Sequence, residues 1–255
     1  MLPIDGLLAL LGAMLALALV EWGVGRGLRV VERRSRLWTN LGLTAVTLAL
    51  NLAGAGLLGL VAQALRARGV GLLHRVPGSA LWLAILTVVV LDLSTYIGHR
   101  TMHRVSWLWW AHRVHHSDEH VDVTTSFRQH PIELALRFVA IALPAWALGL
   151  SPEALAAYRL LSAANALFEH VDLPVPRPLE RLVSWLVVTP GMHKVHHSRE
   201  RAEADSNYGN VLSVYDRFFG TWSAPRPTDA IVYGLGERTP PLPGAAAATL
   251  PPPTT

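Results

Sequence analysis

Histidines gather in this chain at spacings that suit metal binding. Two of them, His99 and His103, lie four residues apart. The pattern H-x-x-H-H then occurs twice, and its members are His112, His115, His116, His193, His196 and His197. On a helix, residues three and four positions apart share one face, so each pattern presents its imidazole groups together. An isolated histidine is usually a surface or hydrogen-bonded residue, but this repeated spacing predicts metal ligands.

The number of clustered histidines also indicates how many metal ions to expect. Eight imidazole groups exceed the four ligands of one tetrahedral zinc site, which favours two ions. The absence of cysteine excludes thiolate ligands, iron–sulfur clusters and disulfides. Neutral nitrogen ligands suit zinc, copper, iron and nickel. Two metals beside an apolar region favour oxidation of a C–H bond by O2 at iron, and zinc-dependent hydrolysis remains open, although no H-E-x-x-H motif occurs.

The segments that must position these histidines are apolar enough to be membrane helices. The chain is 51% apolar and 16% charged, with a mean hydropathy of +0.33. Its long apolar segments are residues 7–22, 37–65, 80–97, 132–150 and 154–168. A spanning helix needs about 20 such residues. We therefore expect an all-α integral membrane protein with about four or five membrane-embedded helices, a single domain over residues 1–240 and a disordered Pro- and Ala-rich tail over residues 241–255.

An acidic residue, Asp92, interrupts the third apolar segment at a depth where a charge is costly. Asp92, Tyr96, His99 and His103 follow one another at intervals of 4, 3 and 4 residues. This spacing puts all four side chains on one helical face. It predicts catalytic roles for Asp92 and Tyr96 beside the first two histidines.

The order of the segments predicts on which side of the membrane the histidines lie. The net charge is +4, and five arginines crowd residues 26–36, directly after an apolar segment. That placement fits the positive-inside rule better than a nucleic-acid surface, so no nucleic-acid partner is expected. If this run is cytoplasmic, counting the crossings puts residues 99–130 and everything after residue 170 on the cytoplasmic side, and we expect a bacterial inner membrane. An amphipathic stretch, residues 177–188, is expected to lie in the interface.

Beyond spacing, several motifs resemble those of the fatty acid hydroxylase and sterol desaturase superfamily, whose members are integral-membrane, non-haem diiron enzymes. The histidine boxes are D-L-S-T-Y-I-G-H-R-T-M-H at 92–103, H-R-V-H-H-S at 112–117 and P-G-M-H-K-V-H-H-S at 190–198. Flanking motifs are T-S-F-R-Q-H-P-I-E at 125–133, F-E-H at 168–170, D-S-N-Y-G at 205–209 and Y-D-R-F-F-G-T at 215–221. The resemblance covers residues 80–223.

This resemblance implies roles for individual residues. It adds His170 to the eight clustered histidines as a ninth metal ligand. It implies that His130 is a ligand or lies just outside the ligands. Asp92, Glu133 and Asp205 are candidates to accept the second N–H group of a ligating imidazole. For Glu133 and Asp205, helix capping or a structural ion pair is an equally good interpretation.

The resemblance also implies the reaction. It implies two iron ions, O2 as co-substrate, and hydroxylation or desaturation of an aliphatic C–H in a lipid or sterol-like substrate. Because no haem domain of the cytochrome b5 type is recognisable, the expected electron source is a separate ferredoxin or cytochrome. Two alternatives remain open. A zinc-dependent membrane hydrolase would act without O2, and a non-catalytic metal-binding or transport protein would need a polar path through its helices.

Overall fold

The computed structural model describes residues 4–26, 34–75 and 78–236, and the expected tail at 241–255 lies outside these ranges. Within them the regular elements are helices, apart from two isolated β-bridges. The α-helices are α1 (Ile4–Gly23), α2 (Arg34–Ala67), α3 (Ala80–Arg104), α4 (Ser106–His116), α5 (Pro131–Leu148), α6 (Pro152–His170), α7 (Arg177–Val183), α8 (Pro190–His196), α9 (Arg201–Ala204) and α10 (Val214–Phe218). Short 3-10 turns are η1 (Leu72–Arg75), η2 (Val123–Thr125) and η3 (Thr228–Ala230).

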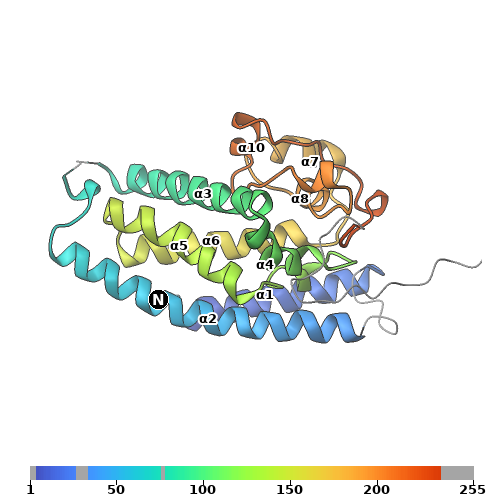
Figure 1. Ribbon diagram of the computed structural model, residues 1–255, viewed down its shortest axis with the longest axis horizontal. Helices are drawn as coiled ribbons and strands as arrows, with labels where there is room; N and C mark the ends of the chain where they lie inside the picture. Colours follow the sequence, from blue (N-terminus) through green and yellow to red (C-terminus); the bar gives the residue numbers. More distant parts are fainter. Residues whose placement is uncertain (1–3, 27–33, 76–77, 237–255) are drawn as a thin grey trace, which may run out of the picture.

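Four of the described helices, α1, α2, α3 and α5, are long and apolar enough to cross a membrane. Large apolar side chains on their outer faces are exposed, among them Leu60, Leu81 and Leu143. Such side chains suit contact with lipid rather than water. The expected all-α integral membrane fold is confirmed. Figure 1 shows the long helices running beside one another, with the short helices α4 and α7 to α10 gathered at one end.

The helix pair α5 and α6 returns the chain to the end from which it left. Gly149 ends α5 with a left-handed φ of 72°, a conformation that glycine adopts without strain. Ser151 then caps α6 by accepting a hydrogen bond from the Ala154 N–H, and Pro152 occupies the first turn. Both features agree with the sequence signals for a helix start. The turn therefore joins α5 and α6 into a hairpin of helices.

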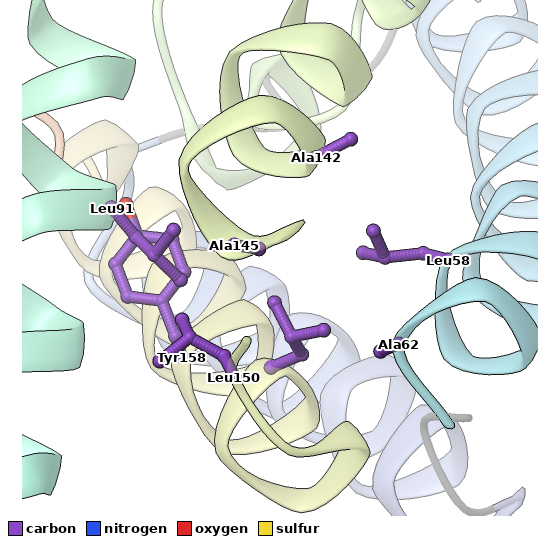
Figure 2. Close-up of a cluster of buried hydrophobic side chains, with 8 residues drawn as sticks. Leu58, Ala62, Leu91, Ala142, Ala145, Leu150 and Tyr158 are labelled. Atoms are coloured by element: carbon purple, nitrogen blue, oxygen red, sulfur yellow. The ribbon is translucent and has the colours of Figure 1, made fainter. Parts of the chain in front are cut away.

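An apolar core holds this hairpin against its neighbours, at the end of the bundle near the α5–α6 turn. It combines side chains from α2, α3, α5 and α6 with Leu150 from the turn between the last two (Figure 2). The buried members are Leu58, Ala62, Leu91, Ala142, Ala145, Leu150, Leu155 and Tyr158. Small alanines at the centre let the helices approach closely, which is how helices associate where lipid removes the hydrophobic driving force.

Polar contacts fasten the other end of the bundle. Arg36, at the start of α2, forms ion pairs with Asp118 (Nε to Oδ1, 2.7 Å) and Asp122 (2.6 Å). The side-chain amide of Asn40 donates to Asp118 as well, and its oxygen Oδ1 accepts a hydrogen bond from Arg128. These contacts tie α2 to the loop that follows α4. The arginine-rich start of α2 thus lies at the same end of the bundle as the histidines.

The ion pairs of Arg36 give a stability prediction. Replacing Arg36 with methionine leaves the carboxylates of Asp118 and Asp122, both fully buried, without their cation. Removing one partner of a buried pair typically costs about 3–5 kcal/mol. Arg36→Met should therefore strongly lower the thermal unfolding midpoint measured in detergent. Arg34→Met changes an exposed arginine two residues earlier and should leave that midpoint nearly unchanged. Equal midpoints for the two variants would contradict this role.

Candidate metal centre

All nine histidines implied as ligands meet at the polar end of the bundle. They come from α3, α4, the last residue of α6, and α8 with the residue after it, and every one is buried. They divide into two groups, in each of which one potential ligand atom per residue lies within 4.8 Å of all the others. The five-histidine group is His99, His103, His112, His116 and His196. The four-histidine group is His115, His170, His193 and His197.

The two H-x-x-H-H motifs are shared between these groups in opposite senses. On α4, the first and last histidines of the motif belong to the five-histidine group and the middle one, His115, to the four-histidine group. On α8 the first and last belong to the four-histidine group and the middle one, His196, to the five-histidine group. The groups are consequently side by side: the rings of His116 and His197, one from each, stack at 4.6 Å between centroids.

A sharp bend lets α3 and α4 face one another. Only Val105 separates the two helices, and its backbone is extended (φ −102°, ψ 116°). The stretch between His103 and His112 is therefore mostly helical. This bend brings the His99 and His112 Nε2 atoms to within 3.1 Å of each other.

Backbone carbonyl oxygens fix the protonation of four of the rings. The Nδ1 atoms lie 3.0 Å from the Tyr208 carbonyl for His99, 3.3 Å from that of Arg128 for His115, 2.7 Å from that of Ala166 for His170 and 2.7 Å from that of Ser206 for His196. A carbonyl oxygen only accepts hydrogen bonds, so Nδ1 carries the hydrogen in each ring. In each neutral ring the Nε2 atom therefore carries no hydrogen and has a lone pair available to a metal.

These lone pairs point at one another. The Nε2 atom of His170 lies 3.2 Å from the Nε2 atoms of both His115 and His193, and the Nε2 atoms of His193 and His197 are 3.1 Å apart. For His115 and His170 neither Nε2 has a hydrogen to donate, so the contact is repulsive unless a cation lies between them. Two nitrogens bound to one metal at about 2.1 Å stand roughly 3.0–3.4 Å apart at right-angled to tetrahedral geometry. The residues therefore fit a metal ion.

Burial keeps the rings in the form that binds metals. Burial, followed by the charges of neighbouring histidines, lowers the pKa of His115, His116, His193 and His197 well below the ordinary value of 6.5. They are neutral at physiological pH, as a ligand must be. In addition, buried nitrogens of His103 and His116 (both Nε2) have no hydrogen-bond partner in the protein. Such atoms are costly to bury unless a ligand satisfies them.

Two acids lie where acceptors for the ligands are expected. The Glu133 Oε1 atom is 3.1 Å from His112 Nδ1 and also accepts from Arg137 Nε at 2.9 Å. The Asp205 Oδ1 atom is 3.5 Å from His103 Nδ1. An acid in this position orients a ligating ring and makes it a stronger donor to the metal. Both acids also form the structural ion pairs that the sequence left open, Glu133 with Arg137 and Asp205 with Arg201 (3.2 Å).

His130 lies outside both groups. Its Nδ1 atom accepts a hydrogen bond from the Ile132 N–H and caps α5, and its ring packs against Trp110 at 4.9 Å. His130 belongs to neither group of potential ligand atoms, and the contacts that it makes are with the start of α5 and with Trp110.

Asp92 differs from its expected catalytic role. Its carboxylate accepts hydrogen bonds from Tyr158 Oη, Asn210 Nδ2 and the backbone N–H groups of Val211 and Leu212, at 2.8–3.1 Å. None of these partners is a histidine. Asp92 lies about two turns before His99 on α3, so sharing a helical face with the ligands does not bring it to them. Its contacts instead fasten the segment after residue 209 to α3.

Tyr96 has a similar position. Its hydroxyl group shares a hydrogen bond of 2.8 Å with Thr221 Oγ1, and its ring stacks on Phe219 at 5.3 Å between centroids. These contacts favour a structural role for Tyr96, in which it holds the C-terminal segment against α3. Like Asp92, it positions the residues around the centre.

Two residues beside the histidines, Glu169 and Tyr208, are not singled out by the sequence analysis. The Glu169 Oε1 atom lies 3.6 Å from His193 Nε2, in a buried position. The ring of Tyr208 packs against His99, His103 and His196, and burial raises its pKa to about 12, so its hydroxyl group keeps its proton. Both residues belong to the flanking motifs at 168–170 and 205–209, but those motifs do not reveal which of their members faces the metal.

Two cavities lie near the centre, and one of them is lined by its histidines. One, of about 260 Å³, reaches His103 and His116 and is lined by basic side chains, namely Arg104, Arg199 and Arg201. The other, of about 130 Å³, lies among α1, α2, α3, α5 and α6. It is lined mainly by apolar groups, and its lining includes Ala166, whose backbone carbonyl oxygen lies 2.7 Å from His170 Nδ1. The first cavity thus opens onto the histidines, and the second lies within the helices next to them.

Comparison with known proteins places the chain. It matches the fatty acid hydroxylase family over residues 84–221, a span that contains both histidine groups. Alkylglycerol monooxygenase of Caenorhabditis elegans is 32% identical over 160 residues, which cover 62% of this chain and 30% of that protein. The protein of that name from Danio rerio is 34% identical over 155 residues, 60% of this chain and 32% of its own length. An ornithine lipid hydroxylase of Rhizobium tropici is 30% identical over 146 residues, 56% of this chain and 43% of its own length.

The matched region is thus about a third of the length of the alkylglycerol monooxygenases. No solved structure matches the chain. The match to the family covers more than half of the chain and includes every histidine of the two groups, and it confirms the resemblance seen in the motifs. The chain belongs to the fatty acid hydroxylase family.

Proposed function

We propose that this protein is a membrane-bound, O2-dependent enzyme that hydroxylates an aliphatic C–H of a lipid with the help of two iron ions. The observation that carries the proposal is the pair of adjacent groups of buried imidazoles, with lone pairs facing one another, at the end of a membrane bundle. The names of the relatives support it, since each describes oxygenation of a lipid. They favour hydroxylation over desaturation.

The residues of this chain give each metal its surroundings. The five-histidine and four-histidine groups supply nitrogen ligands only, a set that suits iron. When bound, the iron ions supply the activation of O2 that oxidation of an unreactive C–H requires. The carbonyl groups of Tyr208, Arg128, Ala166 and Ser206 hold the rings in orientation, and Glu133 and Asp205 do the same from their carboxylates. Burial keeps bulk water away from the reacting atoms.

The substrate reaches the centre from the bilayer in this proposal. The cavity among the long helices offers an alkyl chain apolar walls from Leu10, Phe127 and Phe138. Polar groups of Gln129, Ser162 and Asn210 also line it. A lipid with an alkyl chain and a polar headgroup suits both kinds of wall. We therefore favour an amphiphilic lipid as the substrate over a sterol.

Electrons enter from the opposite direction. The basic cavity beside His103 and His116 offers Arg104, Arg199 and Arg201 to an acidic ferredoxin or cytochrome. We propose that this side faces the cytoplasm. The start of α2 lies at the same end of the bundle, and five arginines fall within residues 26–36, as the positive-inside rule expects of a cytoplasmic segment. A bacterial inner membrane is part of this proposal.

Metal analysis of histidine variants tests the ligand assignment. The iron-loaded protein should contain about two iron ions per chain. His170→Ala, in the four-histidine group, and His196→Ala, in the five-histidine group, should each lose about one ion, because each removes one ligand of one centre. His130→Ala is the matched control and should keep both. If the His130 variant loses iron as the others do, the division into two groups is wrong.

Glu133 provides a graded test of the same centre. Glu133→Gln removes the charge that His112 faces, and loss of such an outer partner typically weakens metal binding or activity about 10- to 100-fold. Glu153→Gln changes an exposed glutamate on α6 and should have no effect. Iron affinity is measured by competition with a chelator. Unchanged affinity and activity in Glu133→Gln would contradict the role given to this carboxylate.

The reaction itself is tested with labelled oxygen. Membranes containing the iron-loaded protein, a reductant and an alkylglycerol or an ornithine lipid as probe are supplied with oxygen-18 gas. A hydroxylated product should carry oxygen from the gas, and none should form under nitrogen. A lipid cleaved by hydrolysis under nitrogen, with the oxygen of water in the cleaved product, would instead support the zinc-dependent hydrolase.

A further inference from the structure

A group of large apolar side chains is exposed on the part of the chain that follows the membrane helices. Phe218 is 82% exposed, Leu182 71% and Trp185 66%. Together with Leu179, Leu186 and Phe219 they form what we call the apolar rim, which lies on α7, α10 and the residues next to them. An exposed apolar patch of this kind on a water-facing surface marks an interaction site.

Hydrogen bonds join the two halves of the rim into one unit. The Val188 N–H donates to the Val211 carbonyl at 2.9 Å, and the Ser213 N–H donates to the Leu186 carbonyl at 3.0 Å. The guanidinium group of Arg217 lies over the ring of Trp185 at 4.4 Å. The residues after α7 and those leading into α10 are therefore held together, with an arginine beside the exposed tryptophan.

The rim is fixed against the membrane-spanning part of α3. The Tyr215 hydroxyl group donates to the Val89 carbonyl at 2.6 Å, and Asp92 holds the backbone of Val211 and Leu212. Val89 lies 15 residues before Arg104, the last residue of α3, or about 22 Å along the helix axis. In Figure 1, α10 accordingly lies beside α3, set back from α4 toward the start of α3.

At that level α3 itself faces lipid. Val89 and Ile97 are exposed apolar side chains within a helix that is long and apolar enough to span the membrane. The rim continues this lipid-facing surface sideways. Its tryptophan and arginine are the pair of residue types that gather where a protein surface meets lipid headgroups.

We propose that the apolar rim is inserted into the lipid bilayer beside α3, so that α10 lies in the membrane and not in the aqueous phase. The occupant of the rim is lipid. An interfacial position is expected from the sequence for residues 177–188 alone, and the proposal extends it to α10, which the sequence places in the cytoplasm. It is independent of the proposed reaction. It places the C-terminal segment, which supplies the carbonyl groups for His99 and His196, at the lipid boundary.

The absence of cysteine makes the test direct, since a single introduced cysteine takes up one nitroxide spin label. Phe218→Cys and Leu182→Cys are labelled in the full chain, in vesicles of phosphatidylcholine and phosphatidylglycerol. Collision with O2, which concentrates in the bilayer, is compared with collision with a water-soluble nickel chelate. Leu60→Cys on the outer face of α2 is the lipid control, and the exposed Glu200→Cys is the aqueous control.

The proposal predicts that labels at 218 and 182 favour O2 over the nickel chelate as the Leu60 label does. A ratio at both positions equal to that of the Glu200 label would overturn it. Dipolar broadening that disappears on dilution with unlabelled protein would show a second copy of the chain on this face, and would overturn lipid as the occupant. A thermal unfolding midpoint in each labelled variant equal to that of the parent protein establishes that the label reports the folded protein.

Discussion

The arrangement of the histidines depends on one physical constraint: nitrogen lone pairs of buried imidazole rings face one another, a repulsive contact that a bound cation would relieve. The Nε2 atoms of the buried, neutral rings of His115 and His170 lie 3.2 Å apart, and in both rings the Nδ1 hydrogen is donated to a backbone carbonyl oxygen. Backbone carbonyl oxygens hold His99 and His196 in the same way. Those carbonyl groups belong to the loop before α5, to α6 and to the segment around residues 206–208. Each of these parts of the chain must be held in place for the rings to converge, and the remaining polar contacts do this.

Two charged or polar contacts, which we call anchors, hold these parts of the chain in place. Arg36 fastens the loop after α4 through Asp118 and Asp122, and that loop leads to the Arg128 carbonyl group. Asp92 fastens the segment after residue 209, directly beyond the Tyr208 carbonyl group. Both anchors bury carboxylates, those of Asp118 and Asp122 in one and that of Asp92 in the other, and burying such groups costs free energy. The hydrogen bonds and ion pairs that fix the arrangement offset this cost. The centre is thus supported from two sides, one at the start of α2 and one within α3.

Much of this could be predicted from the sequence, because hydropathy and histidine spacing are local properties. The long helices and the eight clustered histidines follow from such patterns, whereas His170 is expected only from the family resemblance. Helical periodicity gives the face on which a residue lies but not which segments pack at its level along the helix axis. Asp92 therefore shares a face with His99 and yet binds the backbone of Leu212. Spacing equally cannot assign neighbours such as His115 and His116 to different groups, since that depends on how α4 and α8 cross. His130 resembles a ligand in sequence and becomes a helix cap only once α5 begins at Pro131.

The most direct test of the account is the location of the metals themselves. X-ray diffraction from crystals of the iron-loaded protein, recorded on both sides of the iron absorption edge, locates iron without reference to any assumed chemistry. The account predicts two anomalous peaks, one enclosed by the five-histidine group and one by the four-histidine group. A single peak, or iron bound away from these histidines, would contradict it.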